Sequence, residues 1–268
     1  MKQTQPGSVY WKSRLTEKRY REIKAVNKST LWAMSKSPMH YKFACENPTP
    51  DTPALKMGRA IHAAVLQPKA FRNEWVCAPE IDRRTKEGKA AYEEFMTQAE
   101  GKEIISAADY AEVQAIAAAI HADPSAADLL KGCTTEKPLF WRDEKSGLFC
   151  KCKVDAMKPG IIIDLKTSAD ASTKAFTRDF FKYGYDVQAA HYLDAMQTIT
   201  GEFPDWYFIV IEKAAPYAIN ILKADTGVID YGSVRRDELM KKLKECRAAK
   251  SWSNYGMNEL IMPGYMEG

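Results

Sequence analysis

Two alternating segments joined by Pro159-Gly160 constrain the fold of this chain more than any other feature of its sequence. Apolar and polar side chains alternate in residues 148–157, LFCKCKVDAM, and residues 161–167, IIIDLKT, form a second strand-like run. A proline-glycine pair between two such runs predicts a tight turn and an antiparallel hairpin. If that pair occupies the turn, the register places Asp155 directly opposite Asp164 on one face of the hairpin.

The alternation also predicts which side chains of the hairpin share a face. One face of the first strand carries Leu148, Cys150, Cys152 and Val154, and the other carries Phe149, Lys151, Lys153 and Asp155. On the second strand we expect the core face to carry Ile161, Ile163 and Leu165, and the opposite face Ile162, Asp164 and Lys166. The two hairpin cysteines are therefore interpreted as small buried residues rather than as a metal site.

Two carboxylates facing each other about 5 Å apart at the backbone repel strongly, unless something positive lies between them. Oxygen ligands favour a hard cation such as magnesium or manganese. Lys166 shares the face of Asp164, where it can orient or help deprotonate a water and neutralise charge on a phosphate. A solvated strand face, with Lys151 or Lys153 paired to Asp164, remains the alternative.

Periodic segments elsewhere predict a single α/β domain over residues 1–268 with a helical N-terminal part. Further strands are expected at residues 138–144, 206–212 and 216–222. Helices are expected as short pieces from Ser29, and then at 54–66, 91–100, 108–122, 185–200 and 225–250, with a charged loop at 79–90. Residues 1–28 are interpreted as an extension, and residues 251–268 as a tail with little order.

Composition bounds the class of protein without identifying a partner. Of the 268 residues, 46% are hydrophobic and 28% are charged, which is typical of a globular chain that buries a substantial core. Lysine and arginine total 39 against 35 acidic residues, and a net charge of +4 does not by itself indicate nucleic-acid binding. No segment reads as a signal peptide or as a membrane span, and the six cysteines are scattered, so we expect a cytoplasmic protein without membrane contact.

As an ordered set, these features resemble the PD-(D/E)XK nuclease core. Asp155, followed by IIIDLKT with Asp164 and Lys166, is similar to the core motif itself. The last acid of that motif is often glutamate, and aspartate supplies the same hard oxygens. Gln188 and Tyr192, four residues apart on the predicted 185–200 helix, resemble the Q-x-x-x-Y motif of the RecB-like branch.

The N-terminal half carries a further resemblance. GRAIH, ending at His62, is similar to the G-x-x-x-H motif of the RecB-like branch. Residues 37–68, 140–157 and 183–195 are most similar to phage and prophage RecE-type exonucleases, the exonuclease VIII group. The resemblance covers roughly residues 29–212. It implies a restriction-endonuclease-like α/β fold with a central mixed sheet flanked by helices, in a protein acting in the bacterial host cell.

The resemblance also implies roles for individual residues. It assigns metal binding to His62, Asp155, Asp164 and the backbone carbonyl of Leu165, catalysis to Lys166, and positioning of the scissile phosphate or the lysine to Gln188 and Tyr192. The implied ion is Mg²⁺, for which Mn²⁺ can substitute. Some relatives hold an iron–sulfur cluster on one upstream and three C-terminal cysteines, but the C-terminal region here offers only Cys246, so none is expected.

Taken alone, these residues allow plainer interpretations. A histidine on an apolar helix face, such as His62, is usually a core residue, and Gln188 with Tyr192 can be a buried hydrogen-bonding pair. Glu136 is either an acid behind the metal ligands or a solvated strand end. Basic residues near the site are candidate DNA-backbone contacts or ordinary solvated charges: Arg83, Arg84, Lys86 and Lys89 in one loop, and Lys151 and Lys153 on the hairpin.

The function implied by the resemblance is 5′-to-3′ degradation of linear duplex DNA, which leaves 3′ overhangs for recombination. It also implies a ring-shaped homo-oligomer on double-stranded DNA ends and a RecT-like single-strand annealing partner. Three rivals remain open from the sequence. They are an endonuclease or single-strand nuclease with the same core, a DNA-binding module with a degenerate site, and a metalloenzyme acting on a small phosphorylated molecule.

Overall fold

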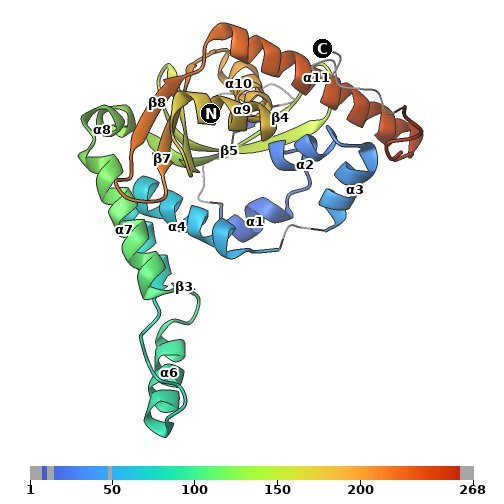
Figure 1. The fold of residues 1–268 in the computed structure, drawn as a ribbon. Helices are drawn as coiled ribbons and strands as arrows, with labels where there is room; N and C mark the ends of the chain where they lie inside the picture. The colour runs from blue at the N-terminus through green and yellow to red at the C-terminus, as the bar shows by residue number, and fades with distance from the viewer. Residues whose placement is uncertain (1–7, 11–14, 48–49, 260–268) are drawn as a thin grey trace, which may run out of the picture.

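The computed structural model describes residues 8–10, 15–47 and 50–259, and its centre is a mixed six-stranded sheet (Figure 1). The strands lie in the order β1 (Ser8–Tyr10), β4 (Thr134–Arg142), β5 (Phe149–Lys158), β6 (Ile161–Ser168), β7 (Asp205–Glu212) and β8 (Ile219–Lys223). Among the described strands of this sheet, only β6 and β7 pair in parallel, because the chain crosses over between them through two helices. The predicted α/β class with a central mixed sheet is confirmed.

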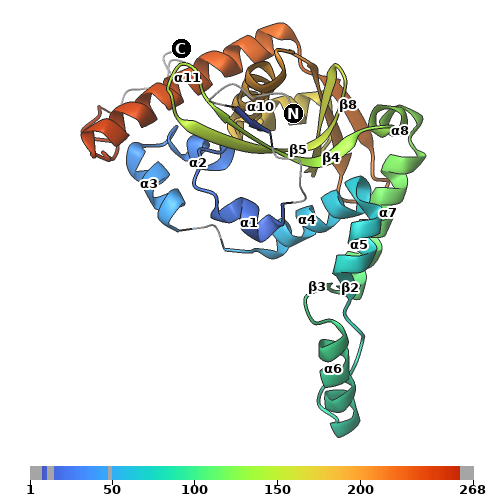
Figure 2. The ribbon, with the colours of Figure 1, turned by 180° about the vertical axis from the view of Figure 1, so that it is seen from behind.

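Helices cover both faces of the sheet (Figures 1 and 2). One core packs α2 (Lys28–Ala33), α9 (Thr173–Lys182), α10 (Tyr185–Thr200) and α11 (Thr226–Ala249) on the sheet. The other packs α4 (Pro53–Leu66), α5 (Pro68–Glu74), α7 (Ala107–Ala122) and α8 (Pro124–Leu130) on the opposite face. The prediction that only one face of β6 is packed against a core is therefore wrong. Ile162 is as deeply buried in the first core as Ile163 is in the second.

The hairpin register predicted from the sequence is confirmed. Lys158 pairs with Ile161 across the turn, and the ladder continues to Ala156 opposite Ile163, one step before Asp155 and Asp164. Gly160 closes the turn with φ +75°, a conformation that favours glycine over other residues.

Short helices in the N-terminal part confirm its predicted helical character. They are α1 (Glu17–Glu22), α2 and α3 (Pro38–Glu46). Ser37 caps α3 by accepting from the His40 backbone N–H at 3.3 Å, and Pro38 takes the first helical position, where no N–H is needed. Residues 1–7 of the predicted extension lie outside the described residues.

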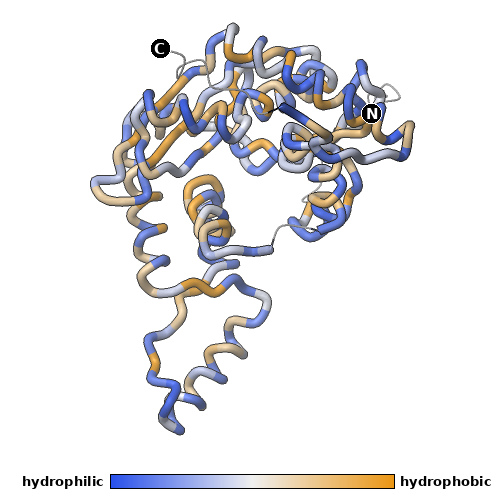
Figure 3. The backbone as a smooth tube through the Cα atoms, turned by 45° about the vertical axis from the view of Figure 1, so that its right-hand side comes forward, coloured by the Kyte–Doolittle hydropathy of each residue, from blue (hydrophilic) through white to orange (hydrophobic). Residues whose placement is uncertain are grey.

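An arm projects away from the sheet and its covering helices (Figure 1). Its base is the parallel pair β2 (Trp75–Cys77) and β3 (Glu103–Ile105), and its outer part is α6 (Lys86–Gln98). Figure 3 shows a hydrophilic tip on this arm. The predicted helix at 91–100 begins too late, because Thr85 accepts a hydrogen bond from the Gly88 N–H and starts α6 inside the expected loop.

Three further expectations need correction. Pro124 does not only end α7, since it occupies the first turn of α8, which the sequence did not predict. Helix α9 was also missed, although its buried Phe176 and Phe180 lie four residues apart. The apolar face expected for the 54–66 helix does not extend to its first turn, where Leu55 is 47% exposed.

The start of the predicted tail is attached to the body, since Trp252 stacks on Tyr41 with the ring centroids 5.7 Å apart. Residues 260–268 of that tail lie outside the described residues. Among the described helices, none combines the length and the apolar character that a bilayer span requires.

A buried ionic network ties α11 to the rest of the first core. Arg236, 3% exposed, donates to Asp194 of α10 at 2.7 Å and to Asp143 beside β4 at 2.5 Å. The Trp141 indole N–H donates to the same Asp194 carboxylate at 2.7 Å. Removing the guanidinium would leave buried negative charges without their partner.

We therefore expect Arg236→Ala to lower the free energy of unfolding by about 3–5 kcal/mol. Lys244→Ala, an exposed change on the same helix, should stay within about 0.5 kcal/mol of the parent chain. Urea denaturation followed by circular dichroism measures both changes. Equal stability of the two variants would contradict a structural role for the network.

Candidate active site

The site begins where β5 and β6 stop pairing. Their ladder ends at Ala156 and Ile163, and beyond it the Asp155 carboxylate takes the place of a strand partner. Its Oδ2 accepts the backbone N–H of Leu165 at 3.0 Å. An acid held in this way is fixed by the backbone of the neighbouring strand, so the separation of the strands sets its position.

Asp155 meets two further side chains that can hold a metal ion. Ligand atoms of His62 from α4, Glu136 from β4 and Asp155 all lie within 4.8 Å of one another. The His62 Nδ1 is 3.5 Å from the Asp155 Oδ2. We refer to these three residues as the carboxylate–histidine trio.

The position of Glu136 in the trio departs from the sequence analysis. From the sequence, Glu136 is either a supporting acid or a solvated strand end, and Asp164 is the expected third side-chain ligand. Glu136 has a left-handed backbone with φ +51°, uncommon for a residue other than glycine and frequent at functional sites. The hydrophobic pattern of β4 carries no sign of this local distortion.

Asp164 belongs to an adjoining group, which we call the lysine network: Asp164, Lys166 and Gln188. Lys166 forms an ion pair with Asp164 Oδ2 and donates to the Gln188 side-chain oxygen at 3.4 Å. The Gln188 amide in turn donates to Asp164 Oδ1, which closes the network. Helix α10 thus presents Gln188 to the two charged residues of β6, and the strand alternation brings Asp164 and Lys166 to the same face, as predicted.

Burial sets the electrostatics of the site. Desolvation raises the pKa of Asp155 to about 6 and also raises that of Asp164, although the charge of Lys166 acts against both shifts. For Lys166, burial would lower the pKa, but the carboxylates of Asp164 and Asp155 outweigh it and the pKa is raised. Lys166 therefore remains a cation at neutral pH.

The donor set fits a divalent metal ion. Burial lowers the pKa of His62, which favours the neutral imidazole that a metal requires. Asp164 Oδ2 is buried, and its ion pair with Lys166 leaves the raised pKa of Asp164 only partly compensated. Carboxylate oxygens are ligands for hard divalent cations, and a neutral imidazole can complete such a site. A cation would also relieve the desolvation that raises the carboxylate pKa values.

The predicted DNA-contact residues lie in three different places. Lys151 is 4% exposed, and its ammonium donates to the carbonyls of Tyr20 at 2.8 Å and Ile23 at 2.7 Å. Its predicted place at a DNA-binding surface is therefore wrong, because the charge is used to hold the end of α1. Lys153 does lie beside the trio, paired with Glu136 and with Glu17 at 3.0 Å.

The third place is the outer part of the arm, where the remaining basic residues gather: Arg83, Arg84, Lys86 and Lys89. Arg83 stacks over the Tyr92 ring at 4.6 Å, and Arg84 pairs with Asp82 at 3.0 Å. Figure 2 shows α6 well separated from α4 and β5, so the structure does not bring these residues to the trio. Their contact with DNA stays a prediction.

Tyr192 lies one turn after Gln188, but its ring packs against Trp206 with centroids 5.6 Å apart. Its predicted role beside the scissile strand stays a prediction, as does that of the Leu165 carbonyl. Two residues at the site were not expected from the sequence. The Tyr185 ring centroid lies 4.6 Å from the Lys166 ammonium. Burial and the nearby charge of Lys166 lower the pKa of Lys28 to about 7. Neither contact has a spacing signal, because both join distant segments of the chain.

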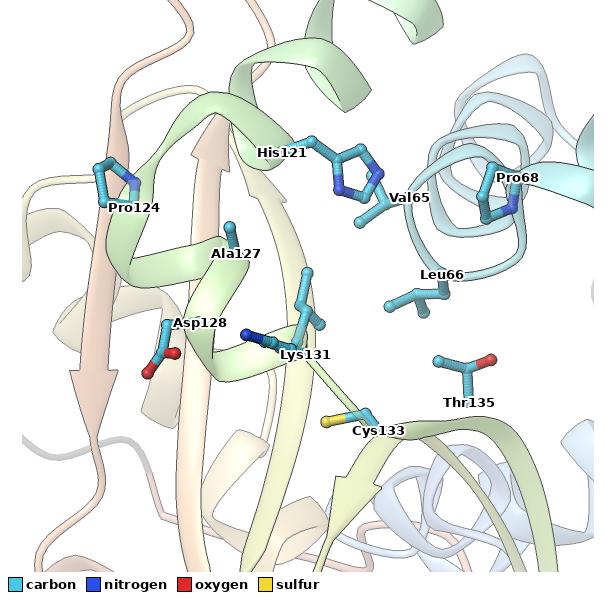
Figure 4. Close-up of a pocket in the computed structure, with 11 residues that line it drawn as sticks. Val65, Leu66, Pro68, His121, Pro124, Ala127, Asp128, Lys131, Cys133 and Thr135 are labelled. Carbon is cyan, nitrogen blue, oxygen red and sulfur yellow. The ribbon is translucent and has the colours of Figure 1, made fainter.

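A separate pocket opens between the α4–α5 junction, α7–α8 and the start of β4 (Figure 4). His121, Asp128 and Lys131 are among its lining residues, together with several apolar side chains. No member of the trio or of the lysine network lines it. The candidate active site is therefore identified by its cluster of buried charged groups and not by this pocket.

Comparison with known proteins agrees with this geometry. A family model described as a PDDEXK-like domain of unknown function, DUF3799, matches residues 27–261. A crystal structure from Eubacterium rectale, named "Putative exonuclease", is similar with a TM-score of 0.63 and 16% sequence identity. The match covers 94% of this chain and 96% of that one, and at this identity it concerns the fold alone. No curated protein sequence matches.

The raised pKa of Asp155 makes a prediction about stability. An acid with a higher pKa in the folded protein opposes folding as pH rises from its unfolded value of 3.8 through its folded value of about 6. Without metal, Asp155→Asn should therefore raise the melting temperature at pH about 7.5. The corresponding gain in the free energy of unfolding is at most about 3 kcal/mol, and it should shrink near pH 5.

Thermal melts in EDTA measure this effect, with Asp230→Asn on the exposed face of α11 as the matched control. The control should show no gain at either pH. Destabilisation by Asp155→Asn in EDTA at the higher pH would contradict the electrostatic description of the site.

Proposed function

The chain belongs to the family of PDDEXK-like domains described as DUF3799, and from this premise we propose that it is a divalent-metal-dependent nuclease that hydrolyses phosphodiester bonds in DNA. The observation that carries the proposal is the lysine network directly beside the carboxylate–histidine trio. Phosphodiester hydrolysis develops negative charge on phosphate oxygens, and a fixed cation next to metal ligands offsets that charge. A purely structural ion pair would have no need of the adjoining trio.

In this proposal, the residues of the site have different roles. His62, Glu136 and Asp155 would hold a divalent cation together with Asp164, and the bound cation would supply an activated water and charge stabilisation. Lys166 acts through its positive charge, since its raised pKa disfavours proton abstraction. Gln188 restrains both Lys166 and Asp164, which keeps the ammonium directed at the phosphate. Mg²⁺ is the proposed ion, with Mn²⁺ as a substitute.

The finer assignment is a 5′-to-3′ exonuclease on linear duplex DNA that produces 3′ overhangs for recombination. It is supported by the resemblance of three segments to RecE-type exonucleases and by the fold that the chain shares with the structure named as an exonuclease. Double-stranded DNA ends, a homo-oligomeric ring and a RecT-like annealing partner belong to the same proposal, as does a phage or prophage origin in the bacterial cytoplasm. An endonuclease with the same site is the second candidate.

Two basic regions are proposed to contact the DNA backbone. Lys153 lies beside the trio, and its pairing with two glutamates keeps it in place until a phosphate competes for it. The basic outer part of the arm projects away from the body (Figure 1), and we propose that it lies along a bound duplex. Contacts of this kind depend on salt and carry no base specificity.

The proposal predicts how the protein digests matched linear and closed circular duplex DNA. With Mg²⁺ the linear form should shorten while the circular form persists, and EDTA should stop the reaction. Lys166→Ala should lower the rate by on the order of 100-fold or more, because charge stabilisation of the phosphate is lost. Lys241→Ala, an exposed change on α11, should cut at the parent rate.

The same digestion separates the alternatives. Cutting of the circular DNA would support the nuclease function and contradict the exonuclease assignment. Binding of DNA without any metal-dependent cutting would favour a degenerate DNA-binding module and contradict the proposal. Duplexes labelled at one 5′ or one 3′ end would then establish the polarity.

A further inference from the structure

Exposed aromatic rings gather beside the proposed catalytic lysine. Tyr183 is 44% exposed, Tyr231 is 53% exposed and Phe181 is 37% exposed. They come from the α9–α10 junction and from α11, two segments that lie side by side in the fold (Figure 1). The Phe181 and Tyr231 rings meet edge to face with centroids 5.7 Å apart. A group of solvent-facing aromatic rings beside a catalytic site is unusual for a surface without a ligand.

These rings are linked to the active site by direct contacts. The Tyr185 ring lies 4.6 Å from the Lys166 ammonium and 5.2 Å from the Lys28 ammonium. The ring of Tyr183 follows, with its centroid 5.9 Å from that of Tyr185. A path of aromatic rings therefore leads from Lys166 to the solvent.

Cations are interleaved with the rings. Arg235 lies 4.8 Å from the Trp32 ring and 5.4 Å from the Tyr231 ring, and Lys28 lies 6.0 Å from Trp32. The Lys28 ammonium also donates to the Tyr183 backbone carbonyl at 2.6 Å. We call the six residues the aromatic–cation surface: Lys28, Trp32, Tyr183, Tyr185, Tyr231 and Arg235.

The backbone is built to present this surface. Gly184 has φ +65°, and a Cβ atom there would lie 2.5 Å from the Trp32 ring. Only glycine allows the chain to turn over Trp32 with a tyrosine on each side. The Arg235 guanidinium is fixed by Asp186 at 2.6 Å, and that carboxylate is fully buried. The surface is thus preorganised and needs no rearrangement to take a ligand.

We propose that the aromatic–cation surface binds unpaired nucleotides of the DNA strand that the site cleaves. This inference rests on the nuclease function proposed above, which supplies the class of ligand. Bases of an unpaired strand stack on aromatic rings while neighbouring cations neutralise its phosphates, and this combination characterises single-strand binding. A closed duplex hides its base faces, so exposed rings gain nothing from it. The surface therefore selects the unpaired strand and directs it towards Lys166.

The test uses the full-length protein in EDTA, so that binding is measured without cleavage. Fluorescence anisotropy of a labelled oligothymidylate of about 15 nucleotides reports single-strand binding, and a blunt duplex of equal length is the comparison. Tyr183→Ala and Tyr231→Ala should each weaken single-strand binding by about 5- to 100-fold, the loss of one stacked base. Duplex binding should change by less than about twofold, because duplex affinity comes from phosphate contacts.

Two further variants sharpen the test. Tyr183→Phe keeps the ring and should keep the affinity for the single strand. Phe203→Ala removes a ring that is 61% exposed just beyond the opposite end of α10, and it should leave binding unchanged. Three results would each overturn the proposal. They are parent-like binding by both tyrosine-to-alanine variants, equal losses of affinity for single strand and duplex, and no single-strand binding by the parent chain.

Failure of this inference can be distinguished from failure of the proposed function. Cleavage of linear duplex by the parent chain with Mg²⁺ reports the nuclease, independently of the anisotropy measurement. If the parent chain cleaves DNA and its tyrosine variants bind the single strand normally, only the proposed role of the aromatic–cation surface is contradicted. If the tyrosine variants selectively lose single-strand binding but the parent chain does not cleave DNA, the aromatic–cation surface is supported and the proposed nuclease function is contradicted.

Discussion

The separation of β5 from β6 is the constraint on which the site depends. Paired strands would have no room for the Asp155 carboxylate to bond the Leu165 N–H, and Asp155 would not meet His62 and Glu136. Buried charges cost stability unless they are compensated, and here Lys166 compensates only part of the charge. The two hydrophobic cores, one on each face of the sheet, hold this arrangement in place.

The raised pKa values of Asp155 and Asp164 have a common physical meaning. Both carboxylates have lost water, and the charge of Lys166 offsets only part of the desolvation. Such incomplete compensation is typical of a site prepared for a cation and a charged substrate, where the ligand supplies the missing interactions. In the buried network of α11, by contrast, Arg236 donates to both Asp143 and Asp194.

The sequence predicts the parts of this molecule that depend on local pattern. The hairpin register, and Asp164 with Lys166 on one face, follow from strand alternation and from one turn. Glu136 could not be placed in this way, because its position depends on a left-handed backbone inside β4. The burial of Lys151 and the contacts of Tyr185 with Lys28 join segments far apart in the chain, and no local pattern encodes them.

Titration calorimetry of the metal-free protein with Mn²⁺ tests the central claim most directly. The parent chain should bind the ion, and Glu136→Gln should weaken binding by about 10-fold or more, since a charged ligand is lost. Glu17→Gln is the matched control, because Glu17 also pairs with Lys153 but lies outside the carboxylate–histidine trio. Its affinity should remain within about threefold of the parent value. No binding by the parent chain, or equal losses in both variants, would contradict the metal site.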